Sequence, residues 1–354
     1  MHLRKGLNYT MIKNKDRLDY LDYLRVIACF SVIFVHVSAI GIVSFESGSM
    51  YHKGIIFLNR LFKYTTPVFL FLSGITSFYS YRIKEYKYLD FLKRRLKTVI
   101  FPFIIWSCIY YSVLVYSGSY NFNILYFIKK LILGNMNYHL YFIPILLQMY
   151  FLSGIINFLF KKINNNIILF SALIINILSM EMSFLFSDRI FMKYIFFYIL
   201  GVYFTKEAFN FLKFSKKYFR PMVFIFLMST LFYSVFYYYS RYDLMNYAWL
   251  IFSVSGIFFL FEISIKLERN NTVSKLIVRK LSKSTYYIYL SHPLILSGIA
   301  RIFKIGSLNL ILILTIYFLM TLLISTILSV SYNEIKNKYL KNKKETKRHV
   351  DMSS

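Results

Sequence analysis

Apolar stretches of about 15–25 residues recur along the whole chain, each with few or no charged side chains. A helix needs about 20 such residues to cross the hydrocarbon core of a bilayer. The pattern therefore predicts ten transmembrane helices. They are expected at residues 21–43, 65–81, 98–117, 139–160, 167–186, 190–204, 221–239, 247–265, 284–302 and 308–332.

The composition supports a membrane protein. Of the 354 residues, 58% are hydrophobic and only 16% are charged. A typical soluble domain is about 45–50% apolar and about 25% charged. These values exclude an ordinary soluble enzyme and a disordered chain, and we expect an all-α integral membrane protein.

The basic residues predict the orientation of the ten helices, because short cytoplasmic loops carry an excess of Lys and Arg. Counted from the N-terminus, 32 of the 43 Lys and Arg residues lie in the two terminal segments and every second loop. Nine lie in or at the edge of the five intervening segments. This alternation predicts that both termini are cytoplasmic.

The domain organisation follows from the same pattern. We expect a cytoplasmic N-terminal segment at 1–20, a ten-helix membrane domain at 21–332 and a basic cytoplasmic tail at 333–354. The net charge of +28 is then an orientation signal with affinity for anionic membrane lipid, and nucleic acid is not an expected partner. The two cysteines lie inside apolar runs, so we expect no disulfide framework and no metal site.

The segment 118–138 contains the apolar and basic stretch 124–133. This stretch is compatible with an amphipathic helix lying along the outer membrane interface. A packed loop that covers the helices explains it equally well.

Polar side chains inside predicted spans are costly and usually mark function or a partner. The first span carries Arg25 and His36, eleven residues apart. Eleven residues are about three helical turns, so both side chains lie on one stripe, about 16 Å apart along the axis. Arginine binds phosphate or carboxylate, and histidine exchanges a proton near neutral pH. Alternatively, Arg25 reaches the inner headgroups and His36 hydrogen-bonds a neighbouring helix.

This spacing resembles the R-x10-H signature of acyltransferase family 3, a family of integral-membrane O-acyltransferases. Further segments are similar to motifs of that family in the same order, although His139-Leu140-Tyr141-Phe142 departs from the commoner H-L-W-F. The similar segments are Leu21–Arg25, Thr66–Gly74, Phe91–Lys97 with Phe101-Pro102, and Tyr286–Leu294.

The resemblance implies transfer of an acetyl or other short acyl group from acyl-CoA to a hydroxyl of a cell-surface polysaccharide, such as a capsule or exopolysaccharide. It implies acetyl-CoA as a co-substrate with no tightly bound cofactor, and a bacterial plasma membrane location. Expected partners are membrane lipid, acyl-CoA, the glycan acceptor and proteins of polysaccharide biosynthesis. Some relatives are assigned to export of poly-N-acetylglucosamine, so an exporter is the alternative.

The expected roles of individual residues follow from this topology. His36 is the expected general base, or forms an acyl-histidine. Coenzyme A is polyanionic, and the predicted cytoplasmic face carries basic side chains that suit its phosphates. The expected donor-binding residues are Arg25, Arg94, Arg95 and Lys97.

Three further residues are candidates for the site. His292 precedes Pro293, which leaves backbone carbonyls free in a helix, so His292 either assists catalysis or satisfies those carbonyls. His139 and Glu181 lie near predicted outer ends, where they are expected to contact the acceptor. Simple solvation of His139, and pairing of Glu181 with a nearby arginine, are the alternatives.

Overall fold

The protein is all-helical in a computed structural model that describes residues 18–82, 84–270, 274–306 and 308–353. No strand forms within these ranges. Most of the predicted N-terminal segment 1–20 lies outside them. A hydrocarbon environment offers no hydrogen-bond partners to the backbone, and a helix satisfies these groups internally.

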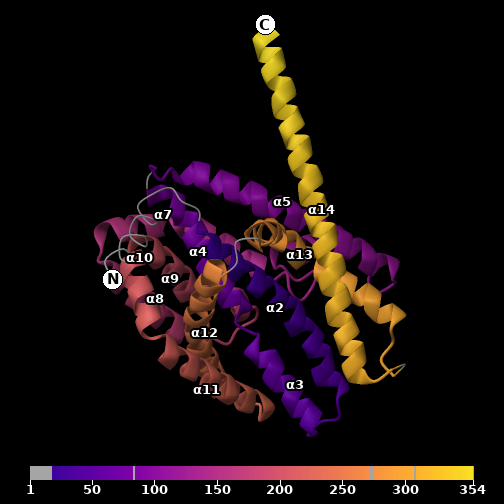
Figure 1. Ribbon diagram of the computed structural model, residues 1–354. Helices are drawn as coiled ribbons and strands as arrows, with labels where there is room; N and C mark the ends of the chain where they lie inside the picture. Colours follow the sequence, from indigo (N-terminus) through magenta and orange to yellow (C-terminus); the bar gives the residue numbers. More distant parts are fainter. Residues whose placement is uncertain (1–17, 83, 271–273, 307, 354) are drawn as a thin grey trace. The chain divides into compact units, whose positions relative to one another are not determined.

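The helices follow one another along the chain with short connections (Figure 1). They are α2 (Asp19–Ser44), α3 (Met50–Leu61), α4 (Thr65–Phe78), α5 (Tyr88–Tyr116), α6 (Ile124–Ile132), α7 (Phe142–Lys162), α8 (Asn165–Met180), α9 (Ile195–Lys206), α10 (Ala208–Lys217), α11 (Phe219–Tyr238), α12 (Tyr242–Asn270), α13 (Ser274–Ile302) and α14 (Leu310–Ser353). Three short 3-10 helices are η1 (Tyr79–Arg82), η2 (Ser187–Arg189) and η3 (Phe191–Lys193).

Each predicted span coincides with a helix, but not every helix is long and apolar enough to cross a membrane. Among the described residues, seven segments meet that requirement, or eight if the bent pair α9 and α10 forms one span. The helix α8 has 16 residues, and α9 and α10 meet at 110°. The count of ten spans and the cytoplasmic position of both termini therefore stay predictions.

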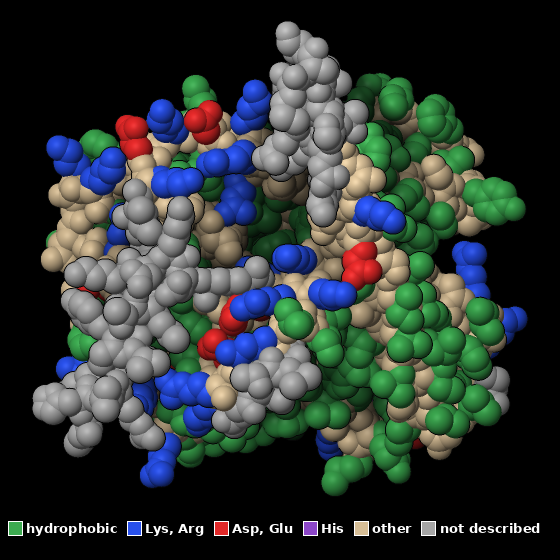
Figure 2. Space-filling model, turned by 45° about the horizontal axis from the view of Figure 1, so that its top comes forward, with side chains coloured by type: hydrophobic (Ala, Val, Ile, Leu, Met, Phe, Trp, Pro, Cys, Tyr) green, Lys and Arg blue, Asp and Glu red, His purple; other side chains and the backbone are tan. Residues whose placement is uncertain are grey.

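Large apolar side chains are exposed on many helices, as expected where lipid replaces water. Among them are Phe101 of α5, Phe170 of α8 and Leu323 of α14, each more than half exposed. Figure 2 shows hydrophobic side chains covering much of the visible surface. The stretch 124–132 forms the helix α6, and none of its residues is buried.

The chain divides into two compact units. The first comprises the residues up to Leu21 together with Lys63–Ile265, and the second comprises Asp22–Phe62 and Lys266–Ser354, as far as these are described. Each unit has its own packed helices and its own candidate functional residues.

Two glycines allow α4 and α9 of the first unit to pack backbone against backbone. A Cβ at Gly74 would lie 2.1 Å from the carbonyl oxygen of Tyr198, and one at Gly201 would lie 2.0 Å from that of Phe71. Small residues permit such approach between membrane helices. Gly74 and Gly201 thus serve close packing of α4 against α9.

The second unit contains α3, a helix in a segment predicted only as a connection. Ser49 caps its N-terminus by accepting a hydrogen bond from the backbone N–H of His52 at 3.1 Å. The Asn59 side-chain amide donates to the carbonyl of Val35 and the hydroxyl of Ser38, both at 2.8 Å. These two bonds fix α3 against α2.

The helix α14 extends without a break from its apolar part through residues 333–353, the predicted basic tail. It packs against α13 in the second unit. The Asn333 amide donates to the carbonyl of Lys283 at 3.0 Å, and Lys280 pairs with Glu334 at 2.9 Å. The first turns of α13 therefore lie beside the middle of α14.

We predict that Gly74→Ala and Gly201→Ala each lower the thermal unfolding midpoint of the purified protein. Each new methyl group meets a backbone oxygen, which cannot rotate away, and such overpacking costs about 1–3 kcal/mol. A shift of about 2–4 °C per kcal/mol is expected for a unit of this size.

Gly298→Ala is the matched control, because no heavy atom lies within 4 Å of its Cβ. Its midpoint should stay the same or rise slightly, since alanine favours a helix. If the unfolding midpoint of Gly298→Ala fell as much as those of Gly74→Ala and Gly201→Ala, the packing argument would be contradicted.

Candidate functional site

The helix α2 positions both residues of the Arg25 and His36 pair. The helix runs unbroken between them, so the predicted separation of about 16 Å along the axis holds. Both side chains are half-buried. They belong, with His292, to the second unit.

Arg25 lies in a closed triangle of polar side chains. Its Nη1 donates to Asp22 Oδ1 at 3.1 Å and to Ser282 Oγ at 2.7 Å. Ser282 Oγ in turn donates to the same Asp22 oxygen at 2.5 Å. Asp22 is one helical turn before Arg25, whereas Ser282 comes from α13. The triangle fixes the guanidinium and links two helices far apart in sequence.

The charge of Asp22 constrains any anion-binding role of Arg25. The Asp22 side chain is 6% exposed and that of Arg25 is 24% exposed, so the carboxylate depends on the guanidinium for compensation. A guanidinium has five N–H donors, and Nη1 makes both bonds of the triangle. Arg25 thus already serves one carboxylate, and an anion-binding role for it stays a prediction.

His36 lies beside His292 of α13. The two ring centroids are 5.3 Å apart and the rings are inclined by 28°, a stacked arrangement. His36 is half-buried, and His292 is fully buried. The structure therefore brings together two histidines that are 256 positions apart in the sequence.

Pro293 explains the orientation of the His292 ring. Proline has no backbone N–H, so it cannot bond the carbonyl of Tyr289 four residues earlier. His292 Nδ1 lies 2.8 Å from that oxygen and 3.1 Å from the oxygen of Ile288. Because carbonyl oxygens only accept, Nδ1 carries a proton, and Nε2 is the acceptor in the neutral ring.

The predicted donor-binding residues Arg94, Arg95 and Lys97 lie on α5 in the first unit. Arg94 is exposed and donates to the hydroxyl of Tyr81. Arg95 is half-buried, donates to the carbonyl of Thr76 at 2.5 Å and lies over the rings of Phe91 and Tyr150. Lys97 is exposed. Arg25 belongs to the other unit, so donor binding by the whole set stays a prediction.

The predicted acceptor-binding residues also lie in the first unit. His139 is 2% exposed, and its Nδ1 lies 3.3 Å from Asn137 Oδ1. Its ring packs edge-to-face with the ring of Tyr110, with 5.6 Å between the two ring centroids. Glu181 ends α8, is exposed and accepts a hydrogen bond from the Tyr247 hydroxyl. Contact of either residue with an acceptor stays a prediction.

Sequence reasoning missed Asp22 and Ser282. The spacing of three residues between Asp22 and Arg25 is a recognisable helical ion-pair spacing and offered one signal. Ser282 offered none, because a single serine in a basic segment is unremarkable by itself. Within the described ranges, no group of three or more His, Cys, Asp or Glu side chains is arranged to hold a metal ion.

Comparison with known proteins identifies the family of the chain. A family model described as an acyltransferase domain matches residues 18–330. No solved structure matches the chain. Together with the apolar helices, the match identifies a multi-pass protein of the bacterial plasma membrane.

Similar curated proteins come from Staphylococcus aureus. Those of strains Mu50 and MSSA476 are each 27% identical over 314 residues, which is 80% of this chain and 84% of theirs. Both carry the name "Probable poly-beta-1,6-N-acetyl-D-glucosamine export protein".

We predict that Arg25→Ala destabilises the protein more than Arg25→Ala combined with Asp22→Asn does. The single change removes the guanidinium 3.1 Å from a buried carboxylate, and breaking a buried ion pair typically costs about 3–5 kcal/mol. Partial exposure of Arg25 places the loss at or below the lower end of that range. Thermal unfolding of the purified variants measures the difference.

The exposed pair Arg241 and Asp243 provides a matched control, since both side chains are more than half exposed and 3.1 Å apart. Arg241→Ala should leave the unfolding midpoint unchanged. If adding Asp22→Asn gave no recovery, the triangle would not depend on charge compensation.

Proposed function

The chain belongs to the acyltransferase-domain family, and on this premise we propose that it transfers an acetyl or other short acyl group from acyl-CoA to a hydroxyl of a cell-surface polysaccharide. The observation that carries the proposal is the pairing of the two polar positions of α2 with α13. Arg25 is held by Asp22 and Ser282, and His36 is stacked on His292. One anion-binding group and one proton acceptor thus share a rigid helix.

In the proposed reaction, His36 accepts the proton of the acceptor hydroxyl. The resulting oxygen nucleophile attacks the thioester carbonyl, an ester C–O bond forms, and the C–S bond breaks. The proton held by His36 then passes to the departing thiolate, which leaves as the free thiol of coenzyme A. Atoms and charge balance without a further reactant. In the second possible route, the His36 ring attacks the thioester first, and the hydroxyl then takes the acyl group from it.

His292 acts in this scheme on His36. Its Nδ1–H is held by the carbonyls of Ile288 and Tyr289, so the ring cannot rotate without breaking those bonds. A fixed ring stacked on His36 restricts the orientation of the base. We therefore assign His292 a positioning role, with the proton transfer itself at His36.

The rival function is export of a polysaccharide, and the names of the Staphylococcus aureus relatives favour it. An exporter needs a path for the polymer through the membrane. The polar residues of α2 and α13 support acyl transfer instead, because Arg25 is held by hydrogen bonds to Asp22 and Ser282 and His36 is stacked on His292, contacts that suit a fixed catalytic group. The two functions differ in which product appears outside the cell.

We predict that His36→Ala abolishes acetylation of the surface polysaccharide while polymer yield and protein abundance stay unchanged. Loss of a general base typically lowers the rate about 10²–10⁴-fold. The measurement is ester-linked acetyl per unit of extracted polymer, in cells that carry either variant. His52→Ala is the matched control, because His52 lies on α3 of the same unit and its Nδ1 accepts from the Gly48 N–H at 3.3 Å. Normal acetylation with polymer retained inside the His36→Ala cells would favour export.

We predict that Arg94→Gln and Lys97→Gln raise the KM for acetyl-CoA more than they lower kcat. Both side chains are exposed and basic, so each is expected to contribute charge attraction toward the phosphates of coenzyme A. The KM increase should shrink as salt is added, since salt screens exposed charges. Lys161→Gln, at the exposed end of α7, is the control. Equal KM values for all three variants would remove these residues from the donor site.

A further inference from the structure

An apolar groove lies on the second unit, between α2, α3 and α14, on a different face of α2 from His36. Its volume is about 370 Å³, within the usual range of ligand sites. On α2 the groove is lined by positions 34, 37 and 38, which share one helical face, and Phe45 directly follows the helix. His36 is about half a turn away from that face. The groove is thus separate from the site proposed for acyl transfer.

The polar atoms in the groove are already engaged. Ser38 Oγ donates to the carbonyl of Phe34 at 2.7 Å and accepts from the Asn59 amide. Thr315 Oγ1 donates to the carbonyl of Ile311 at 2.8 Å. These are the only two hydroxyl-bearing aliphatic side chains of the lining. Apart from Tyr51, which is 64% exposed, the lining offers no further side-chain hydroxyl to a sugar, a phosphate or a nucleotide, so a hydrocarbon occupant fits it best.

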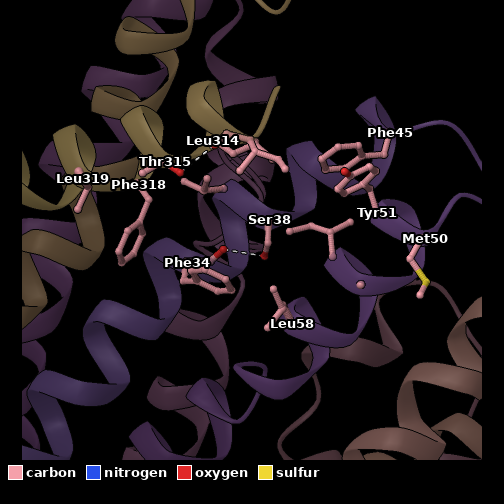
Figure 3. A pocket seen from close by; sticks show the side chains of 14 residues that line it. Phe34, Ser38, Phe45, Met50, Tyr51, Leu58, Leu314, Thr315, Phe318 and Leu319 are labelled. Carbon is pink, nitrogen blue, oxygen red and sulfur yellow. Dashed lines mark hydrogen bonds between the residues drawn. The ribbon is translucent and has the colours of Figure 1, made fainter. Parts of the chain in front are cut away.

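The two ends of the groove lie at different places along its helices. The helix α2 ends at Ser44, α3 begins at Met50 and α14 begins at Leu310, so three helix ends lie at one end of the groove. Figure 3 shows Phe45, Met50 and Tyr51 together at this end, and Phe318 and Leu319 at the opposite end. The first end therefore lies at the helix ends, and the second lies about two turns into α14.

The length of the groove matches one leaflet of a bilayer. From Phe34 to Ser44, the last residue of α2, is ten residues, or about 15 Å of helix, and Phe45 follows directly. The hydrocarbon core is about 30 Å thick, so a leaflet contributes about half of that. A groove in this environment is not filled by water, and an empty one would deprive its lining of dispersion contacts.

We propose that this groove is a binding site for one acyl chain of a bilayer phospholipid. The carboxyl end of the chain lies near Met50 and Tyr51, which are 85% and 64% exposed, and the methyl end lies near Phe34 and Phe318. The bound chain fills the space between α3 and α14 and so supports α2, the helix that carries Arg25 and His36. The assignment does not depend on the reaction that the protein catalyses.

Gly54 gives a direct way to fill the groove. It lines the groove on α3, and no heavy atom lies within 4 Å of a Cβ built there. Gly54→Phe therefore introduces a ring into open space. Gly298→Phe is the matched control, because Gly298 lies on a helix of the same unit and its Cβ site is equally open.

The test uses the full chain in phosphatidylcholine vesicles that contain a phosphatidylcholine with a photoreactive diazirine in one acyl chain. A diazirine near the carboxyl end should label the peptides around Phe45, Met50 and Ile311. A diazirine near the methyl end should label those around Phe34 and Phe318. In Gly54→Phe, labelling of the groove should fall to the level of the other exposed apolar faces, whereas Gly298→Phe should keep it.

Labelling that is even over all apolar faces, or unchanged in Gly54→Phe, would overturn the proposal. So would crosslinking of the groove to a second copy of the chain in place of lipid. If Gly54→Phe does not elute as a folded protein, Gly54→Leu provides the same test with a smaller side chain. None of these outcomes depends on acyl transfer.

Discussion

The absence of hydrogen-bond partners in the hydrocarbon core is the constraint on which the structure depends. Backbone groups meet it by forming helices, and polar side chains meet it by pairing with one another or with backbone carbonyls. Asp22, Arg25 and Ser282 satisfy one another in a triangle. His292 takes the carbonyl that Pro293 leaves free. The same requirement therefore explains both the fold and the composition of the candidate site.

The helix α2 connects these features. It carries the charged triangle near one end and the stacked histidines in its second half, and α13 supplies the partner of each. Two contacts separated by about three turns hold α2 and α13 in a single register. In the proposed function, this register places the group that binds the donor and the group that accepts the proton at fixed positions. The apolar groove occupies another face of the same helix.

The positions of the long helices were predictable from the sequence, because apolar runs of the required length dominate it. The helix α3 was missed, since Lys53 and Arg60 lower its hydropathy and its stability comes from Asn59 bonded to α2. The Arg25 and His36 pair was predictable from spacing along one helix. Ser282 and the stacking of His292 on His36 were not, because they depend on which helices pack together. The charge alternation predicts an orientation, and only a measurement in a membrane tests it.

In the proposed function, His36 of α2 is the base that enables transfer of an acyl group from coenzyme A to a glycan. The most direct measurement uses purified protein in vesicles, with acetyl-CoA and polysaccharide supplied, and counts free coenzyme A thiol and ester-linked acetyl together. The account predicts one thiol released for each acetyl ester formed by the wild type, and neither product above background with His36→Ala. Movement of polysaccharide across the vesicle membrane by the wild type, without thiol release, would contradict it.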